Sequence, residues 1–406
     1  MIYLLIIIIL LFLCYLYDYK GNEKGRLLSY ILVMIYLICL AGFRYRMGTD
    51  ALKYEYHYSQ EHTITELTMG DFRNTRFAPL YIILSSICRT VTPEFMFVQF
   101  VIAIIVNMTV FKFVWDHTRH IFFAILLYLF FLYIMLNMEV YREAMAACVF
   151  LWSWQYFRDG KWVKYYILAT VAFFFHVSAI VLFILPICCC PGIKSLFTLG
   201  KQTYIIAPLL LVASFGINYV LFDFIQMIAL TDTMAERAET YSKHALGGNL
   251  LNMAGALTQI IKYVAYPMVA LYFVKKNSNS SRSFQNGEGQ KMEIVSMVAI
   301  YSALLSVGIA IFHRYHHYFY IFPIVIMSEW VFSWMKVRSK KISLNFIYWI
   351  FIFLPLIGLQ LYSVYFTHYN KSGTIKVYMM YYPYSNQFDK EIDPDRAKAI
   401  RYSRRY

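Results

Sequence analysis

Runs of apolar residues, many of them long enough to cross a lipid bilayer, follow one another along nearly the whole chain. The hydrocarbon of a bilayer is about 30 Å thick, and roughly twenty helical residues cross it. Backbone groups inside lipid have no water to bond with, so such a run has to be helical. A membrane β-barrel would show segments of about ten residues with alternating polarity, and the sequence lacks that pattern. The sequence therefore predicts an all-α, polytopic integral membrane protein.

The apolar runs predict about twelve transmembrane helices. They lie at residues 2–17, 27–43, 95–114, 121–138, 143–157, 162–176, 177–190, 203–223, 254–274, 293–312, 316–334 and 343–366. The shorter run at 79–91 is predicted to be a re-entrant segment or half-helix that enters the membrane without crossing it. Because no soluble domain and no internal repeat can be recognised, residues 1–406 are expected to form a single membrane domain.

Composition supports this class of protein. The chain is 60% hydrophobic and only 15% charged, and its formal net charge is +14. In a soluble protein that charge would suggest a nucleic-acid partner, but membrane proteins concentrate Lys and Arg in cytoplasmic loops, so no nucleic acid is expected. The seven cysteines lie nearly all inside apolar runs and lack metal-binding spacing, so they are interpreted as core residues.

The basic loops predict the orientation. Lys and Arg cluster in four loops, at 18–26, 158–164, 275–292 and 336–341. Placing these loops inside puts the amino terminus outside. The segments then expected outside are the loop 44–94 with its half-helix, residues 139–142, the loop 224–253, the turn near 313–315 and the tail 367–406. The loop 275–292, rich in Ser, Asn and Gly, is expected to be flexible and cytoplasmic. This orientation requires 162–190 to form two short spans that turn near His176.

Ionisable residues from four distant parts of the chain fall at the outer face in this orientation. They are Arg44, Arg46 and Asp50, then Arg142 and Glu143, then His176, and finally Arg314. Ionisable groups beside hydrocarbon are costly and are functional candidates by default. A single arginine at the membrane boundary extends to lipid headgroups as often as it serves a site. The prediction of a site therefore depends on the convergence of ionisable residues from four parts of the chain.

The types of these residues point to an anionic ligand. Arg44, Arg142 and Arg314 suit a group with several negative charges, because a guanidinium binds phosphate oxygens through paired hydrogen bonds and stays charged. Asp50 is either a base or the ion-pair partner of Arg44 or Arg46. No metal site is expected, and no cofactor.

Three histidines have a spacing that could hold a metal ion. His313, His316 and His317 have the helical spacing i, i+3, i+4, but no carboxylate lies near them in the sequence. The sequence also lacks the short motifs of serine hydrolases and zinc proteases, which disfavours those enzyme classes.

Several motifs resemble the EpsG family of bacterial polysaccharide polymerases, which are similar in role to Wzy-type O-antigen polymerases. They are Phe43-Arg44-Tyr45-x-x-Gly48-Thr49-Asp50 with Tyr54 four residues on, Tyr141-Arg142-Glu143-Ala144-Met145-Ala146, Phe175-His176-x-Ser178-Ala179, Arg314-x-x-x-Tyr318 and Pro383-Tyr384. The resemblance covers about residues 40–390. Two positions depart from the family pattern: Glu143 stands where Gln is usual, and Ala78 stands where an acidic residue is common.

The resemblance implies a membrane glycosyltransferase that makes exopolysaccharide, capsule or O-antigen at the outer face of the bacterial cytoplasmic membrane. The glycan would pass from undecaprenyl diphosphate to a hydroxyl of a lipid-linked acceptor repeat unit. Because diphosphate is a good leaving group, the transfer is expected to be metal-independent. A single displacement would invert the anomeric centre. The implied partners are the undecaprenyl-diphosphate-linked oligosaccharide and membrane lipids, and a chain-length regulator or other export machinery is left open.

The resemblance also implies roles for the site residues. The candidates for the base are His176, Asp50 and Glu143, of which His176 lies among apolar neighbours that favour a neutral imidazole. The expected substrate-binding side chains are Arg44, Tyr45, Arg46, Tyr54, Arg142, Arg314, Tyr318 and Tyr384.

Two other functions remain alternatives at this point. A flippase or transporter of lipid-linked glycans would need charges deep in the membrane or on its inner side as well. An O-acyltransferase at the outer face would use the same histidine as base with a thioester donor.

Overall fold

The computed structural model describes residues 2–73, 77–228, 253–276, 288–338, 353–363 and 375–403. Within these ranges the regular secondary structure is helical, and an isolated β-bridge joins Arg44 to Asn386. The prediction of an all-α fold is confirmed. The chain divides into two compact units, one formed by Met1–Ile184 with Gln360–Tyr406 and the other by Leu185–Leu359. Whether they form the predicted single membrane domain stays a prediction.

Apolar helices dominate both units. Three helical stretches are long and apolar enough to cross a membrane: Ile2–Tyr19, Phe95–His117 and Gly255–Lys276. A fourth is added if Val177–Cys189 and Pro191–Phe197, which are bent by 95°, count as one span. The shorter apolar helices are Arg26–Gly42, Pro79–Val91, Ile121–Tyr133, Trp162–Phe175, Thr203–Phe215, Ile321–Val331 and Phe353–Ser363. The number of about twelve spans remains a prediction.

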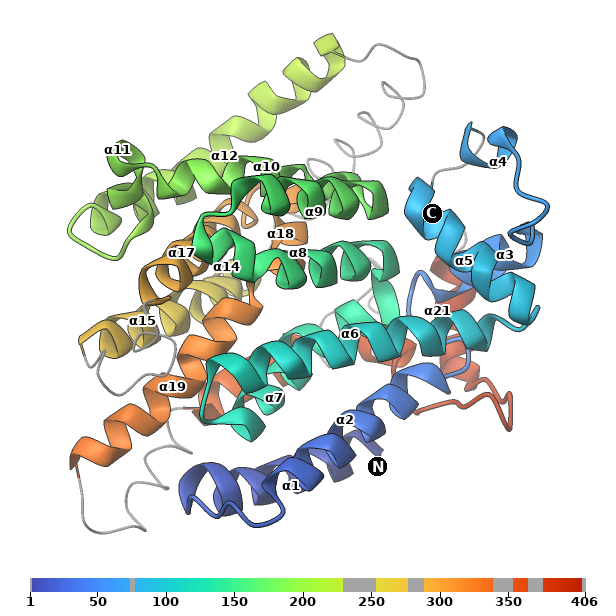
Figure 1. Ribbon diagram of the computed structural model, residues 1–406, viewed down its shortest axis with the longest axis horizontal. Coiled ribbons are helices and arrows are strands. Elements are labelled where there is room, and N and C mark those ends of the chain that lie inside the picture. Colours follow the sequence, from blue (N-terminus) through green and yellow to red (C-terminus); the bar gives the residue numbers. More distant parts are fainter. Residues whose placement is uncertain are drawn as a thin grey trace. The chain divides into compact units, whose positions relative to one another are not determined.

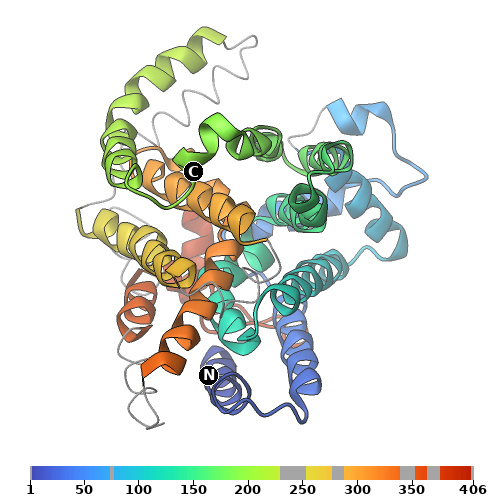
Figure 2. The ribbon, with the colours of Figure 1, turned by 60° about the vertical axis from the view of Figure 1, so that its left-hand side comes forward.

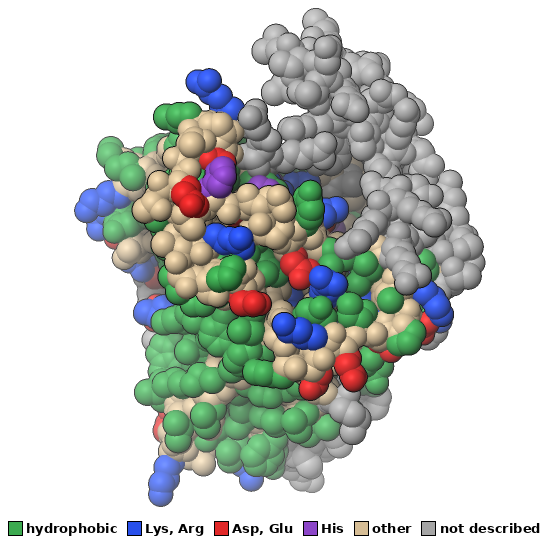
Figure 3. Space-filling view, turned by 90° about the vertical axis from the view of Figure 1, so that its right-hand side faces the viewer, with side chains coloured by type: hydrophobic (Ala, Val, Ile, Leu, Met, Phe, Trp, Pro, Cys, Tyr) green, Lys and Arg blue, Asp and Glu red, His purple; other side chains and the backbone are tan. Residues whose placement is uncertain are grey.

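Apolar surfaces are exposed on the first two helices. Apolar residues stand exposed along them: Leu4, Leu5 and Ile8 on the first, and Leu27, Leu28 and Leu32 on the second. Soluble proteins rarely expose such continuous apolar surface, whereas a helix facing lipid requires it. On the face seen in Figure 3, hydrophobic side chains cover one region and charged side chains gather in another. The surface is that of a membrane protein.

The first unit contains the amino-terminal helices and the carboxyl-terminal segment (Figure 1). Its elements are α1 (Ile2–Leu13), η1 (Cys14–Tyr19), α2 (Arg26–Gly42), α3 (Ala51–Gln60), α4 (Met69–Arg73), α5 (Pro79–Val91), α6 (Phe95–His117), α7 (Ile121–Tyr128), η2 (Leu129–Tyr133), η3 (Met135–Glu139), α8 (Tyr141–Asp159), α9 (Trp162–Phe175), η4 (Val177–Ile180), α10 (Val181–Ile184), η10 (Val377–Met380) and α21 (Pro394–Ser403). The helix at Phe353–Ser363 spans the boundary between the units.

Close packing joins the long helices of this unit. The α2 and α6 helices lie side by side in Figures 1 and 2, and α6 packs in turn on α8, and α8 on α9. Gly42 permits the approach of α2 to α6, because a Cβ there would stand 2.1 Å from Cδ2 of Phe100. At the other end of α2, Asp18 accepts a 2.8 Å hydrogen bond from the amide of Phe123 in α7. Arg26 reaches the carbonyl of Arg119 at the same end.

The chain breaks at His176, as predicted. The α9 helix ends at Phe175, His176 is extended with φ −158° and ψ 132°, and η4 begins at Val177. The Tyr165 hydroxyl of α9 donates a 2.7 Å hydrogen bond to the carbonyl of Leu182 in α10. The chain therefore doubles back along α9, and the prediction of a turn near His176 is confirmed.

The α5 helix is held at both ends by one short segment. Near its start, the Phe77 ring lies 5.7 Å from the ring of Tyr54. Beyond its end, the Thr92 carbonyl accepts a 2.8 Å hydrogen bond from the hydroxyl of Tyr58. Because Tyr54 and Tyr58 are one turn apart in α3, both ends of α5 lie beside the same helix.

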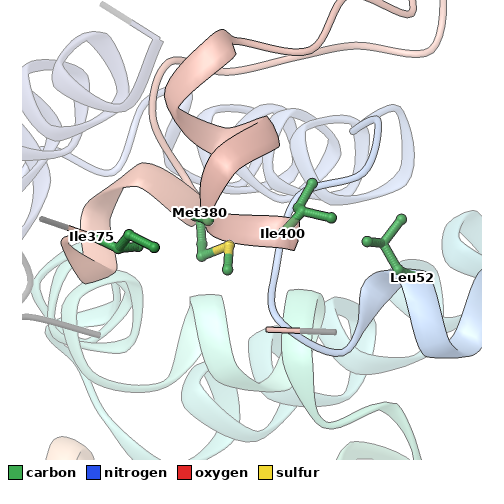
Figure 4. Packing of buried hydrophobic residues seen from close by; sticks show 5 residues of the cluster. Leu52, Ile375, Met380 and Ile400 are labelled. Atoms are coloured by element: carbon green, nitrogen blue, oxygen red, sulfur yellow. The ribbon is translucent and has the colours of Figure 1, made fainter. Parts of the chain in front are cut away.

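The carboxyl-terminal segment folds onto the loop that follows α2. The amide of Tyr45 donates to the carbonyl of Ser385 at 2.9 Å, and the amide of Gln387 donates to that of Phe43 at 2.8 Å. A small hydrophobic cluster closes the contact (Figure 4); its buried members are Leu52, Ile375, Met380, Ala399 and Ile400. The described part of the tail and the loop therefore share one side of this unit. That this side faces outward stays a prediction.

The second unit is also helical in its described residues. Its elements are η5 (Leu185–Cys189), α11 (Pro191–Lys194), η6 (Ser195–Phe197), α12 (Thr203–Ile228), α14 (Met253–Ile260), η7 (Ile261–Ala265), α15 (Tyr266–Lys276), α17 (Gly289–Leu305), η9 (Ala310–Arg314), α18 (Tyr315–Phe319) and α19 (Ile321–Arg338). An ion pair of 2.8 Å between Lys275 and Glu293 joins α15 to α17. Most of the loops 224–253 and 275–292, and much of the span 343–366, lie outside the described residues.

Cysteine labelling tests the arrangement of the first unit. In a protein depleted of its own cysteines, Lys53→Cys and Lys390→Cys should react with an impermeant thiol reagent from the same side, because both exposed positions lie on the loop and tail that pack together. Lys24→Cys and Lys161→Cys, at the far ends of α2 and α8, should react from the opposite side. Labelling of Lys53→Cys and Lys390→Cys from opposite sides would contradict the fold.

Candidate functional site

Two charged residues stand at the start of α8, where the chain re-enters the helical bundle. Arg142 and Glu143 occupy the first turn, directly after the break at Val140. The Arg142 guanidinium lies 4.7 Å above the ring of Phe77 and is hydrogen-bonded to Tyr54. A cationic group over an aromatic face is attracted to the ring, and the planar guanidinium suits this position. The first turn of α8 therefore presents a half-buried arginine beside an aromatic cluster.

That aromatic cluster comes from four segments of the first unit. The Tyr54 ring lies 4.8 Å from the Tyr141 ring and 5.6 Å from the Tyr81 ring. The Phe77 and Tyr81 rings are stacked at 5.4 Å, and Phe95 lies 6.4 Å from Tyr141. Offset and edge-on aromatic pairs at such distances stabilise one another. The cluster joins α3, α5, α6 and α8 on the side where α8 begins.

Glu143 and His176 come together from α8 and from the break after α9. Nε2 of His176 lies 3.5 Å from Oε1 of Glu143, and both side chains are buried. On the other side of the ring, Nδ1 lies 2.6 Å from the hydroxyl oxygen of Ser178 and accepts a 3.2 Å hydrogen bond from the amide of Ser178. The structure thus brings together Arg142, Glu143, His176 and Tyr54 from the predicted set, and adds Ser178.

A second buried carboxylate organises the loop beside this cluster. Glu139, the last residue of η3, accepts hydrogen bonds from the amide of Thr49 at 2.7 Å, from the hydroxyl of Thr49 at 2.5 Å and from the amide of Asp50 at 3.2 Å. The hydroxyl of Tyr381, in the carboxyl-terminal segment, donates to the same carboxylate. Hydrogen bonds to a charged acceptor are among the stronger ones in proteins.

The Gly-Thr-Asp motif is explained by this carboxylate. Gly48 has φ +102°, which L side chains rarely adopt, and a Cβ there would stand 2.7 Å from the carbonyl oxygen of Met138. The glycine therefore lets the chain turn against η3, and the next two residues direct their amides at Glu139.

Arg44 is enclosed by protein. It is fully buried, and its guanidinium donates to the carbonyls of Ala41 at 2.5 Å and of Met47 and Met138 at 3.4 Å, and to the hydroxyl of Tyr141. The carbonyls at the end of a helix need such partners, because no further turn supplies them. In this structure Arg44 therefore holds the end of α2 against η3 and α8, and most of its guanidinium hydrogen bonds go to backbone carbonyls.

The other candidates of the 43–50 loop face different partners. Asp50 forms a 2.9 Å ion pair with Lys53, which corrects the expectation of a pair with Arg44 or Arg46. Arg46 forms a 3.0 Å ion pair with Glu55 and lies 5.3 Å above the ring of Tyr45. All four of these ion-pair side chains are partly exposed, so the pairs contribute little to stability.

The remaining predicted residues are distributed over both units. In the first, the half-buried Tyr384 donates a 3.0 Å hydrogen bond to the carbonyl of Leu40 at the end of α2. In the second, Arg314 ends η9 and is half-buried, and Tyr318 is buried in α18. The contribution of Arg314 and Tyr318 to one site with Arg142 stays a prediction.

Glu139, Ser178 and Tyr381 were not among the predicted site residues. Glu139 had a usable signal, because it is an acidic residue at the end of an apolar run and stands four residues before Glu143. Ser178 lies inside a recognised motif, but the motif does not reveal which ring nitrogen its hydroxyl faces. Tyr381 is one of many tyrosines in its segment, so composition could not single it out.

Substitution of Glu139 tests how the loop is held. Glu139→Gln should lower stability by about 1–3 kcal/mol, because a neutral amide with one oxygen replaces a charged acceptor of several hydrogen bonds. It should also expose the chain after Lys390 to trypsin, since Tyr381 loses its partner. Thermal unfolding in detergent and limited proteolysis measure both effects. The matched control Glu55→Gln removes a partly exposed ion pair and should cost less than about 1 kcal/mol. Equal losses for the two variants would contradict this account.

Comparison with known proteins identifies the family. The family model described as the EpsG family matches residues 27–386, which is nearly the whole chain. The matched range contains the loop 43–50, the start of α8, the break at His176 and the segment that carries Tyr381 and Tyr384. No curated protein and no solved structure matched the chain. The chain therefore belongs to the EpsG family, which is associated with polysaccharide biosynthesis in membranes.

Proposed function

We propose that this protein is a Wzy-like polysaccharide polymerase of the bacterial cytoplasmic membrane. It would transfer a glycan from undecaprenyl diphosphate to a hydroxyl of a lipid-linked acceptor repeat unit, at the outer face. The observation that carries the proposal is the buried pair of Glu143 and His176, next to Arg142 at the same end of the first unit. This group supplies a base, a carboxylate that stabilises it and a fixed positive charge, which are the groups that glycosyl transfer from a diphosphate requires.

The imidazole of His176 takes the proton of the acceptor hydroxyl in this proposal. The Glu143 carboxylate stands on the far side of the ring, 3.5 Å from Nε2, where it stabilises the imidazolium that forms. Contacts of this kind are often long in the absence of substrate and shorten when the substrate binds. The acceptor oxygen then bonds to the anomeric carbon as the bond from that carbon to the diphosphate oxygen breaks. A single displacement of this kind inverts the anomeric centre.

Arg142 is the residue that we assign to the diphosphate. Arg142 is half-buried, and its guanidinium lies over the ring of Phe77, which helps to hold it in place. A fixed cation beside the leaving group stabilises the negative charge that develops there. Arg44 serves a different purpose in this proposal, because its nitrogens are directed at backbone carbonyls that fix the entry of α8.

The outward orientation is supported by the contacts inside the first unit. The loop after α2 contacts the described tail, and α3, which follows that loop, contacts the tail, the two ends of α5 and the start of α8, so these segments can share one aqueous side. At the opposite ends of α2 and α8 lie basic residues, among them Lys24 and Lys161. Lys and Arg favour the cytoplasmic side, which would turn the Glu143–His176 pair outward.

O-acyl transfer is a second candidate function. Ser178, His176 and Glu143 form a hydroxyl–imidazole–carboxylate series, which is also the arrangement that activates a serine for attack on an acyl donor.

Purified protein in nanodiscs, supplied with lipid-linked repeat units, separates the candidate functions. The polymerase proposal predicts longer glycans and released undecaprenyl diphosphate. Acylated repeat units, or translocation without a new glycosidic bond, would overturn it.

Variants of the diphosphate site give a first prediction for this assay. Arg142→Ala should lower the polymerisation rate about tenfold to a hundredfold, because a hydrogen-bonded charge is lost from the transition state. Arg142→Lys should restore only part of the rate, since an ammonium cannot make the paired contacts of a guanidinium. Arg158→Ala, at the far end of α8, removes a partly exposed arginine and is the matched control. Wild-type rates for Arg142→Ala would remove Arg142 from the proposed site.

Variants of the base give a second prediction. His176→Gln should lower turnover by roughly a hundredfold to ten-thousandfold, since glutamine keeps a polar group but accepts no proton at neutral pH. Glu143→Gln should lower turnover less, because the base remains and only its stabilising charge is lost. His62→Gln, at an exposed histidine that pairs with Asp71, is a histidine control outside the proposed chemistry. Near-normal turnover of His176→Gln with a large loss in Asp50→Asn would transfer the base to Asp50.

A further inference from the structure

The amide and the hydroxyl of Ser178 both contact Nδ1 of His176, the ring nitrogen that has to accept the proton if His176 is the base. The backbone amide of Ser178 can only donate a hydrogen bond, and it donates to Nδ1 at 3.2 Å. Nδ1 is therefore the nitrogen without a proton in the neutral ring, and Nε2 carries the proton. The Ser178 hydroxyl, 2.6 Å from Nδ1, is then the donor in that contact. Nε2–H is directed at Oε1 of Glu143 at 3.5 Å.

This arrangement limits how a substrate can reach the base. The only lone pair of the imidazole that can accept a proton is on Nδ1, and the Ser178 hydroxyl already points at it. His176 is buried, whereas Ser178 is only partly buried, so Ser178 is the more accessible of the two residues. An acceptor hydroxyl would therefore meet the Ser178 oxygen before it meets the ring.

We infer that Ser178 is a catalytic residue that relays the acceptor proton to His176. The inference rests on the proposed polymerase function. As the acceptor oxygen bonds to the anomeric carbon, its proton passes to Oγ of Ser178, and the proton of Ser178 passes to Nδ1. The electron pair of the broken bond leaves with the diphosphate, and Glu143 stabilises the imidazolium through Nε2–H. Serine ends the step as it began, with one proton, and no further reactant is needed.

The local backbone fixes the relay. The chain is extended at His176 and enters η4 at Val177, which places the amide and the hydroxyl of Ser178 around the same ring nitrogen. The ring is thus held in one orientation by its own chain, while Glu143 comes from α8. A residue two positions from the base therefore sets both its tautomer and its access to substrate.

An isosteric pair of variants tests the relay in nanodiscs with lipid-linked repeat units. Ser178→Thr keeps the hydroxyl, and Ser178→Val has nearly the same shape without it. We expect Ser178→Thr to stay within a few-fold of wild-type kcat, and Ser178→Val to lose roughly tenfold to a hundredfold in kcat with little change in KM, because proton transfer is impaired and substrate binding is not. Ser153→Ala removes a hydroxyl of α8 that bonds a backbone carbonyl, and it is the matched control.

The outcomes separate the relay from the function on which it rests. Equal kcat for Ser178→Thr and Ser178→Val, at any level, would overturn the relay while leaving the polymerase intact. A glycan covalently attached to the Ser178 peptide in the mass spectrum would also overturn it, because serine would then be a nucleophile. If the wild-type protein forms no glycosidic bond, the proposed function itself fails. Thermal unfolding of the two variants should coincide, so a difference in kcat reports on the hydroxyl.

Discussion

The carboxylate of Glu139 holds together three segments that are far apart in the sequence. It lies at the end of η3, and its oxygens accept hydrogen bonds from the loop after α2 and from Tyr381 of the carboxyl-terminal segment. The α8 helix starts two residues later, so the position of Arg142 and Glu143 depends on the same contact. Burying a carboxylate costs free energy unless hydrogen bonds satisfy its oxygens. Here the donors belong to Thr49 and Asp50 of the loop and to Tyr381 of the tail.

Breaks in the helices create the candidate site. At the end of α2, before α8 and after α9, the chain leaves helical geometry and frees backbone groups that lipid could not satisfy. Side chains take up many of these groups: Arg44 binds the carbonyls, Glu139 binds the amides of the 48–50 loop, and His176 binds the amide of Ser178. The polar residues at this end thus stabilise the irregular backbone, and the same irregularity places Glu143 beside His176.

The sequence predicted the parts of the fold that depend on local pattern. Apolar runs located the helices, and the single histidine inside the run 162–190 marked the break that the structure contains. Sequence could not show where side chains point. Arg44 and Arg142 look alike in the sequence, yet one is directed at backbone carbonyls and the other lies over an aromatic ring. The predicted ion-pair partner of Asp50 was wrong for the same reason, since Asp50 pairs with Lys53, one turn away in the chain.

A structure with substrate bound would test the central claim most directly. Glu143→Gln protein in nanodiscs, incubated with a lipid-linked repeat unit and imaged by cryo-electron microscopy, should accumulate substrate because turnover is slowed. The account predicts density for the diphosphate within hydrogen-bond reach of the Arg142 guanidinium, and a sugar hydroxyl beside Ser178 and His176. A diphosphate bound elsewhere, with no sugar near His176, would contradict the assignment of the Glu143–His176 pair as the site of glycosyl transfer.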